Sequence, residues 1–188
     1  MQRRFGRRLG RPLRRLLRGG IPPLLIRSNE LLSIGNYAEA ADGLEQLARA
    51  AEVRGDRRGG RRAANLYLEA GRARLMAGQK TQGLELLKSG LNLLAVVGMG
   101  IRRARIGGRI LEELEASGLV DEARQISAIL GIPAQGPGAT SAEPAPSKRP
   151  PLPTHCPACG APMRPDEVDW MDEATAECNY CGSPVRGE

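Results

Sequence analysis

The chain has 188 residues and a formal net charge of +7, and 41% of its residues are hydrophobic although only 3% are aromatic. Ala, Leu and Gly supply most of the apolar content, which favours helices over a β-sandwich. The apolar runs are far shorter than the ~20 residues that span a bilayer. The basic N-terminus lacks the apolar stretch of a secretory signal, so we expect a cytoplasmic protein with reduced cysteines.

The N-terminal arm, residues 1–20, contains eight arginines and no acidic residue. Phe5, Leu9 and Leu13 recur at helical spacing among these arginines, which is typical of a basic amphipathic helix that adsorbs to an anionic membrane surface. The same arginines suit contact with RNA or DNA. Two glycines and a proline weaken the helix, so a solvated tail is the simplest interpretation. The membrane, the nucleic-acid and an acidic-partner alternative stay open.

Residues 21–132 are expected to be helical. An apolar cluster over 24–34 precedes Gly35, and apolar residues then recur at helical spacing over further segments. These predicted helices cover about residues 40–51, 61–77, 81–97, 101–116 and 120–130. The glycine-rich stretch 54–60 is expected to end the first of these helices and to separate it from the second.

The helical segments repeat. Gly35, Gly78 and Gly118 follow one another at offsets of 43 and 40 residues, and each is expected to end a helix in the left-handed conformation. A small residue stands five positions after each glycine, where it would let two antiparallel helices approach closely. These small residues are Ala40, Gly83 and Ala123.

The repeat resembles the tetratricopeptide repeat family over residues 21–132. The resemblance rests on Gly35, Asn36 and Tyr37 with Ala40, and on Gly71 with Gly78 and Gly83. The spacing exceeds the 34 residues of that family, and its closing proline is missing. The resemblance implies a mainly α protein of antiparallel helix pairs, a solenoid whose concave groove binds proteins or peptides. A plain helical bundle is the alternative.

Residues 133–153 are rich in Pro, Ala, Gly and Ser and show no apolar periodicity, so they are predicted to be a linker. All four cysteines follow this linker. They form two Cys-x-x-Cys pairs separated by 18 residues: Cys156 with Cys159 and Cys178 with Cys181. This spacing predicts a four-thiolate site for one Zn²⁺ ion. Four protein ligands leave no open position, so the metal is expected to be structural.

Other uses of the four cysteines are weaker. A redox dithiol needs only one pair, and disulfides are disfavoured without a secretory signal. A rubredoxin-type iron site would use the same ligands, so iron is not excluded. His155 adjoins Cys156, but a lone histidine beside a complete set of ligands is interpreted as a bystander.

Residues 154–188 resemble the zinc ribbon family. Gly160 and Gly182 each follow the second cysteine of a pair, where positive φ suits a turn whose N–H groups point at sulfur. The resemblance implies that the four cysteines are the ligands and that residues 168–171 and 175–177 are strands. Trp170, the only tryptophan, is expected to cover the metal site as part of the ribbon's small core.

The ribbon is acidic, with a charge of −5 over residues 154–188. Its carboxylates would repel phosphates, so a nucleic-acid-binding ribbon is disfavoured. Six of these acids lie between the second and third cysteines or adjoin the third: Asp166, Glu167, Asp169, Asp172, Glu173 and Glu177. We expect a small acidic module at the end of a tether.

These features favour a non-catalytic adaptor that binds a protein partner through its helical repeats. The helical region has no His or Cys, so it lacks the usual sets of nucleophile and base, and neither an enzyme nor a small-molecule substrate is predicted. The alternative is a nucleic-acid-associated or peripheral membrane protein that acts through residues 1–20.

Overall fold

Six helices and one small antiparallel sheet make up the described residues of this computed structural model, which are 21–55, 57–131 and 149–187. The basic arm at residues 1–20 and most of the predicted linker lie outside these residues. None of the six helices is both long and apolar enough to cross a bilayer. The helices are α2 (Pro23–Ser33), α3 (Tyr37–Glu52), α4 (Arg57–Met76), α5 (Lys80–Val96), α6 (Gly100–Ala116) and α7 (Val120–Leu130).

Glycines in the left-handed conformation end the helices, as the sequence predicted. Gly35, Gly78 and Gly118 have φ of +80°, +77° and +72°. At Gly78 the glycine N–H donates to Leu75 O and the next N–H donates to Arg74 O, each at 2.9 Å. This paired bond closes the helix end without leaving carbonyls unpaired. Gly98, which the repeat alignment passed over, ends α5 in the same way.

The predicted small residues are buried or tightly packed, and Gly83 lies at a close helix crossing. Ala40 is fully buried and Ala123 is nearly so. A Cβ added at Gly83 would lie 2.8 Å from the Leu75 side chain and 3.0 Å from the carbonyl oxygen of Gly71. Helices α4 and α5 therefore touch backbone to backbone at this crossing, because neither glycine carries a side chain.

Helix α4 begins earlier than predicted. The whole stretch 54–60 was expected to separate two helices, but only its first part does so, at Gly55 with φ of +68°. The helix starts at Arg57 and contains Gly59 and Gly60, both buried. A Cβ at Gly60 would lie 2.6 Å from the Val97 side chain. This glycine serves close packing inside a helix rather than termination.

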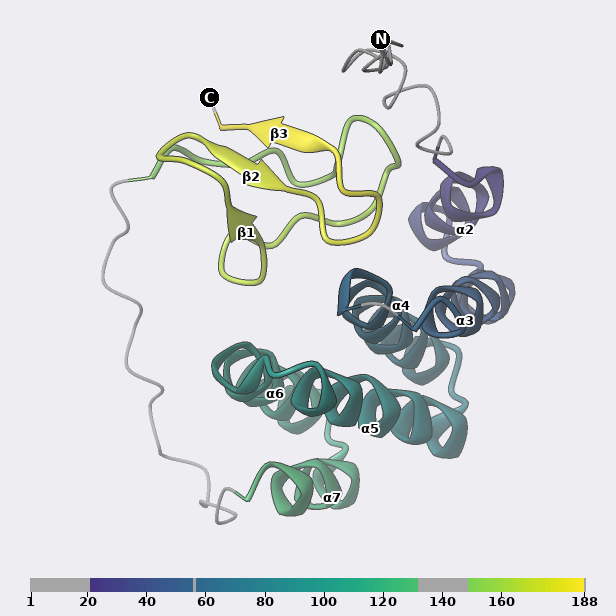
Figure 1. Ribbon diagram of the computed structural model, residues 1–188. Coiled ribbons are helices and arrows are strands. Elements are labelled where there is room, and N and C mark those ends of the chain that lie inside the picture. Colours follow the sequence, from purple (N-terminus) through teal and green to yellow (C-terminus); the bar gives the residue numbers. More distant parts are fainter. Residues whose placement is uncertain (1–20, 56, 132–148, 188) are drawn as a thin grey trace, which may run out of the picture.

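Consecutive helices pack against one another in chain order. Figure 1 shows the sheet lying over the side of the helices formed by α2, α4 and α6, with α5 and α7 farther from it. The helical core consists mainly of leucine, isoleucine and alanine side chains, among them Leu44, Leu66, Leu87, Leu91, Leu94, Ile106 and Ile110.

The sheet has strand order β1–β2–β3, and both pairings are antiparallel. Its strands are β1 (Asp169–Trp170), β2 (Thr175–Glu177) and β3 (Pro184–Arg186). The first two lie within the predicted ranges. The third was missed because three residues, with only Val185 buried, are too short to show an alternating pattern.

The C-terminal module, residues 149–187, lies against the helices instead of apart from them (Figure 1). One cluster of buried side chains joins Leu25, Leu44 and Tyr67 of the helices to Val168 and Val185 of the module. Trp170 is half-buried at the edge of this cluster, and its indole N–H donates to Pro165 O at 3.3 Å. The helices and the module therefore share a core.

Candidate metal centre and its docking surface

Two tight turns carry the four cysteines. Gly160 and Gly182 have φ of +72° and +76°, which confirms the predicted left-handed positions. Each glycine N–H donates to the carbonyl oxygen of the first cysteine of its pair, Cys156 or Cys178, at 2.9 Å. Other N–H groups reach sulfur: that of Ala158 bonds to Cys156 and that of Cys181 bonds to Cys178. The turns thus aim backbone dipoles at sulfurs, which favours thiolates.

The four sulfurs lie in one cluster. All the Sγ atoms are within 4.8 Å of one another, with 3.8 Å between Cys156 and Cys181 and 3.9 Å between Cys159 and Cys178. A tetrahedron with ~2.3 Å metal–sulfur bonds has edges of about 3.8 Å. The cysteines are free, not disulfide-bonded. The donor set and its spacing therefore fit one tetrahedral ion such as Zn²⁺.

Hydrogen bonding among the sulfurs separates their pKa values. Bonds with Cys159 and Cys178 lower the pKa of Cys156 to about 6. The same bond with Cys156 raises the pKa of Cys159, whose burial acts in the same direction. A bound cation would take the place of the protons that the sulfurs share. All four groups could then be thiolates, so the opposite pKa shifts would disappear.

His155 does not join the cluster. The group of potential ligands found among the described residues consists of the four cysteines alone. The His155 Nδ1 atom lies 3.1 Å from the Thr154 hydroxyl, and the residue is exposed.

The helices hold the first cysteine turn directly. The side-chain amide of Asn29, on α2, donates to Cys159 O at 2.7 Å, and Asn29 is buried. From α4, Asn65 donates to Asn179 O at 3.4 Å. Arg62, also on α4, has its pKa lowered by burial and by Arg54, against the negative charge of the nearby cysteines, which raises it. The candidate metal centre therefore lies where the C-terminal module contacts helices α2 and α4.

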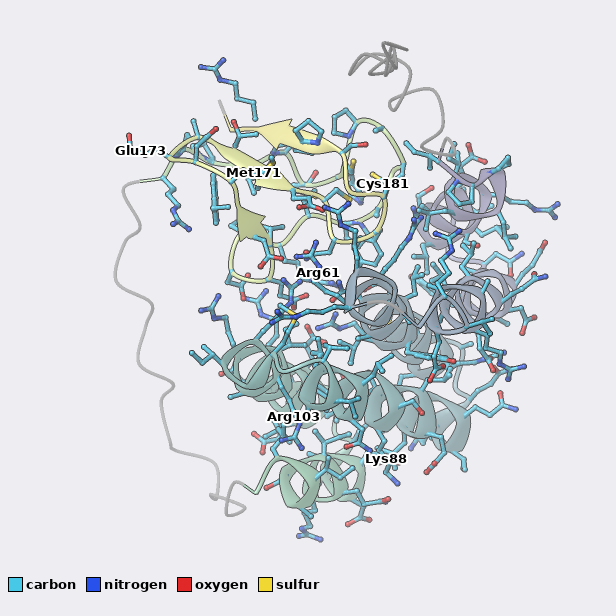
Figure 2. The ribbon with its side chains drawn as sticks, viewed as in Figure 1. Arg61, Lys88, Arg103, Met171, Glu173 and Cys181 are labelled. Atoms are coloured by element: carbon cyan, nitrogen blue, oxygen red, sulfur yellow. The ribbon has the colours of Figure 1, made fainter. Side chains whose placement is uncertain are left out.

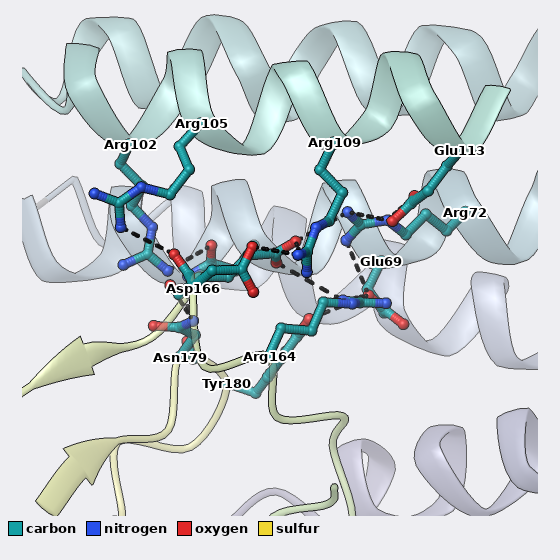
Figure 3. A network of polar contacts seen from close by, with 12 residues as sticks. Glu69, Arg72, Arg102, Arg105, Arg109, Glu113, Arg164, Asp166, Asn179 and Tyr180 are labelled. Carbon is teal, nitrogen blue, oxygen red and sulfur yellow. Dashed lines mark hydrogen bonds and ion pairs between the residues drawn. The ribbon is translucent and has the colours of Figure 1, made fainter. Parts of the chain in front are cut away.

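A buried ionic network fastens the module to α4. Glu69 accepts hydrogen bonds from Arg164 and from the Tyr180 hydroxyl, each at 3.1 Å, and lies 3.5 Å from Arg72 (Figure 3). Arg72 also lies 3.2 Å from Glu167 of the module. Positive and negative groups thus alternate across the contact, and none of the buried charges lacks a counterion.

The pKa values in this network follow from burial and ion pairing. Burial alone would raise the pKa of Glu69, but Arg164 and Arg72 outweigh it and the pKa is lowered. Burial likewise works against the charge of Arg164, and Glu69 more than compensates by raising its pKa. Burial raises the pKa of Tyr180, which stays a neutral donor. Glu69 and Arg164 are therefore charged at neutral pH.

A second group of contacts lies at the edge of the module, and it is more exposed except at Arg102, which is 8% exposed. Arg61 lies 2.6 Å from Asp169 and 3.1 Å from Glu177. Arg102 lies 2.9 Å from Asp169, and Arg109 lies 2.6 Å from Asp166. The Arg105 guanidinium donates to Asp166 O at 2.9 Å. Figure 2 shows Arg61 directed toward the module, whereas Lys88 and Arg103 lie on the other side of the helices.

Most of the module's acids therefore face inward. Asp166, Glu167, Asp169 and Glu177 pair with arginines of α4 and α6 rather than forming a free negative surface. Asp172 accepts hydrogen bonds from the backbone of its own turn. The sequence carried one signal of this docking that was not used: Arg102, Arg105 and Arg109 recur at spacings of three and four, on one face of a helix.

A cavity of about 760 Å³ adjoins the buried network. Its polar lining includes Tyr37, Glu69, Arg72, Lys80 and His155. Its apolar lining comes from several helices and includes Leu32, Ala73, Met76, Leu87, Ile110 and Leu114. The module closes one side through Gly160, Pro162 and Arg164. The cavity thus has walls from both parts of the molecule and a volume in the range of ligand-binding sites.

Sequence reasoning located the four cysteines but not the surface on which they dock. The cavity and the Glu69 network join residues about one hundred positions apart, and no local pattern marks such a pairing. Searches of protein-family models, of curated proteins and of solved structures gave no match to this chain.

Proposed function

We propose that this chain is a non-catalytic adaptor that binds an extended segment of a partner protein in the cavity between its helices and its C-terminal module. In this proposal the helices are a divergent array resembling tetratricopeptide repeats, and the module is a zinc ribbon. The observation that carries the proposal is the cavity of about 760 Å³ with walls from both parts.

The metal has a structural role in this proposal. Zn²⁺ held by Cys156, Cys159, Cys178 and Cys181 would order a module too small to fold on its apolar core alone. Iron would occupy the same ligands. Because four thiolates fill the tetrahedron, the ion would supply stability and no open position for a substrate.

The chemistry of the cavity favours a peptide with apolar side chains. Leu32, Leu75 and Met76, none of which is fully buried, offer apolar surface, which rewards burial of apolar side chains. Lys80 and Glu113 give its rim both signs of charge, which suits the polar backbone of an extended segment.

A peptide selection tests the proposal. A phage-displayed library of random peptides is selected against the full-length, zinc-loaded chain. We expect enrichment of peptides with two or more apolar residues, bound with micromolar affinity, as is typical of a short segment in a groove.

Two matched serines give the control. Ser117 lines the cavity and Ser89 does not, yet both are exposed and both donate to the carbonyl four residues earlier at 2.8 Å. Ser117→Trp would fill the cavity and abolish binding of the selected peptides, whereas Ser89→Trp would leave it intact. Equal binding by both variants, or no enrichment, would refute the proposed function.

A further inference from the structure

The edge of the docking surface is a row of arginines. Arg102, Arg105 and Arg109 cover about 10 Å along one face of α6, at 1.5 Å per residue. Arg61 on α4 contacts the same module strand as Arg102, since both lie within 3 Å of Asp169. We call these four residues the arginine row; Figure 3 shows its α6 members above the module's carboxylates.

The row is only partly more exposed than the buried network, since the side chains of Arg61 and Arg102 are 23% and 8% exposed. The side chain of Arg109 is 36% exposed and that of its partner Asp166 is 28% exposed. Asp169, which pairs with Arg61 and Arg102, is 38% exposed. Ion pairs that water reaches contribute little stability, and salt screens them. Another anion could therefore replace Asp166 beside Arg109 at small cost, whereas Asp169 also pairs with the buried Arg102.

The module's carboxylates occupy positions that suit phosphates. Arginine binds carboxylate and phosphate with the same planar pair of N–H groups. Residues 154–188 carry −5 and residues 1–20 carry +8, so residues 21–132, which contain the row, carry only +3. The close spacing of the arginines along the row favours a polyanion with regularly spaced charges over an acidic protein.

We infer that the arginine row is a binding surface for single-stranded nucleic acid that the acidic module covers as long as metal keeps the module folded. The inference uses the structural metal of the proposed function but not the peptide cavity. Metal loss unfolds the module, its carboxylates lose their fixed positions, and the row becomes accessible. The module stays covalently joined to the helices. When metal binds again, the refolded module therefore competes with RNA for the row at high effective concentration.

The test is binding of a fluorescein-labelled 20-nucleotide single-stranded RNA to the full chain, followed by anisotropy. We expect chelation of the metal to raise the affinity about tenfold or more, and the gain to fall steeply with salt. Asp166→Asn combined with Asp169→Asn should raise the affinity with metal still bound. This variant keeps the test valid if the chelated protein aggregates.

A charge-matched pair of triple variants locates the site. Arg102→Gln, Arg105→Gln and Arg109→Gln together should abolish the gain and make the plot of log affinity against log salt shallower by about two, at ~0.7 per lost phosphate contact. The control is Arg27→Gln, Arg49→Gln and Arg124→Gln, which removes three exposed arginines outside the row. The control should retain the gain.

Three results would overturn the inference. Affinity that is the same with and without metal would show that the module covers no RNA site. Equal loss in the two triple variants would show that only net charge matters. Competition by polyglutamate as strong as that by unlabelled RNA would assign the row to acidic proteins. None of these results bears on the peptide cavity, so failure here is distinguishable from failure of the proposed function.

Discussion

The helical array and the C-terminal module are stabilised in different ways. In the array, fully buried leucines and isoleucines pack over backbone contacts such as that between Gly71 and Gly83. The module buries only a few apolar side chains around four cysteines, and much of its remaining contact is ionic. The comparison leads us to expect that the array folds through packing, whereas the module requires a metal at its cysteines and the surface beneath it.

Removal of one cysteine should separate the two parts most strongly. Structural zinc supplies roughly 10–16 kcal/mol in small zinc peptides, so Cys178→Ser should release the metal and unfold the module. We expect loss of zinc by elemental analysis, a red shift of Trp170 fluorescence, and nearly unchanged helical circular dichroism. His155→Ala, beside Cys156, should keep its zinc. Loss of the helical signal in the Cys178 variant would show that the array depends on the module.

Truncation of Glu69 should have the next largest effect. Glu69→Ala removes one of the two buried carboxylates that Arg164 and Arg72 share, and breaking a buried ion pair typically costs about 3–5 kcal/mol. In urea unfolding, the Trp170 transition should move further than the helical transition. The control is Glu113→Ala, whose side chain is 40% exposed beside Arg72 and should cost under about 1 kcal/mol. Similar losses in both variants would contradict the idea of a buried anchor.

Acid should weaken the same anchor, but by less, because a protonated carboxyl keeps its hydrogen bonds. The pKa of Glu69 is lowered on folding, so its contribution is complete above the ordinary value of 4.5 and is lost as pH falls through the folded pKa. Acid also releases metal from thiolates. The measurement is therefore the difference in unfolding free energy between the native chain and Glu69→Gln, which should shrink below about pH 4.5. A constant difference would contradict this assignment.

The close crossing of α4 and α5 at Gly83 gives a smaller and purely steric effect. Gly83→Val places a branched side chain against Gly71 O and Leu75, and overpacking of this kind costs about 1–3 kcal/mol. The control is Gly108→Ala on α6, where an added Cβ meets no atom within 4 Å. Alanine there should stabilise the chain by about 0.5–1 kcal/mol, because glycine is a poor helix former. Thermal unfolding followed by circular dichroism compares the two.

These residues also show what the sequence could predict. Gly35, Gly78 and Gly118 carry local information, since only glycine readily takes the left-handed conformation that ends a helix. The ends of α7 at Val120 and Leu130 follow from the same kind of signal. The four cysteines were equally readable, because ligand spacing within each turn is local.

Other residues carried no such local signal. Gly60 is a glycine like Gly78, but it lies inside a helix. Only its close approach to Val97 explains why a residue without a side chain is needed there. The pairing of Glu69 with Arg164 and Tyr180 joins distant parts of the chain. From sequence alone an acidic segment is predicted to face solvent, because the arginines that pair with it lie far away in the chain. The docking of the module was missed for that reason.

The smallest effect should come from the edge of the docking surface, and it compares two arginines that share one carboxylate. Arg72 and Arg109 both approach Glu167, but Arg72 is 12% exposed and Arg109 is 36% exposed. Arg109→Gln should cost about 0.2–1 kcal/mol, whereas Arg72→Gln, which removes a buried counterion shared by Glu69 and Glu167, should cost several times more. Raising NaCl from about 0.1 to 0.5 M should reduce the Arg109 effect and spare that of Arg72, because salt screens exposed pairs. Equal effects would mean that the contact is one rigid interface; unequal effects would mean that the module's edge can open while Glu69 still holds it.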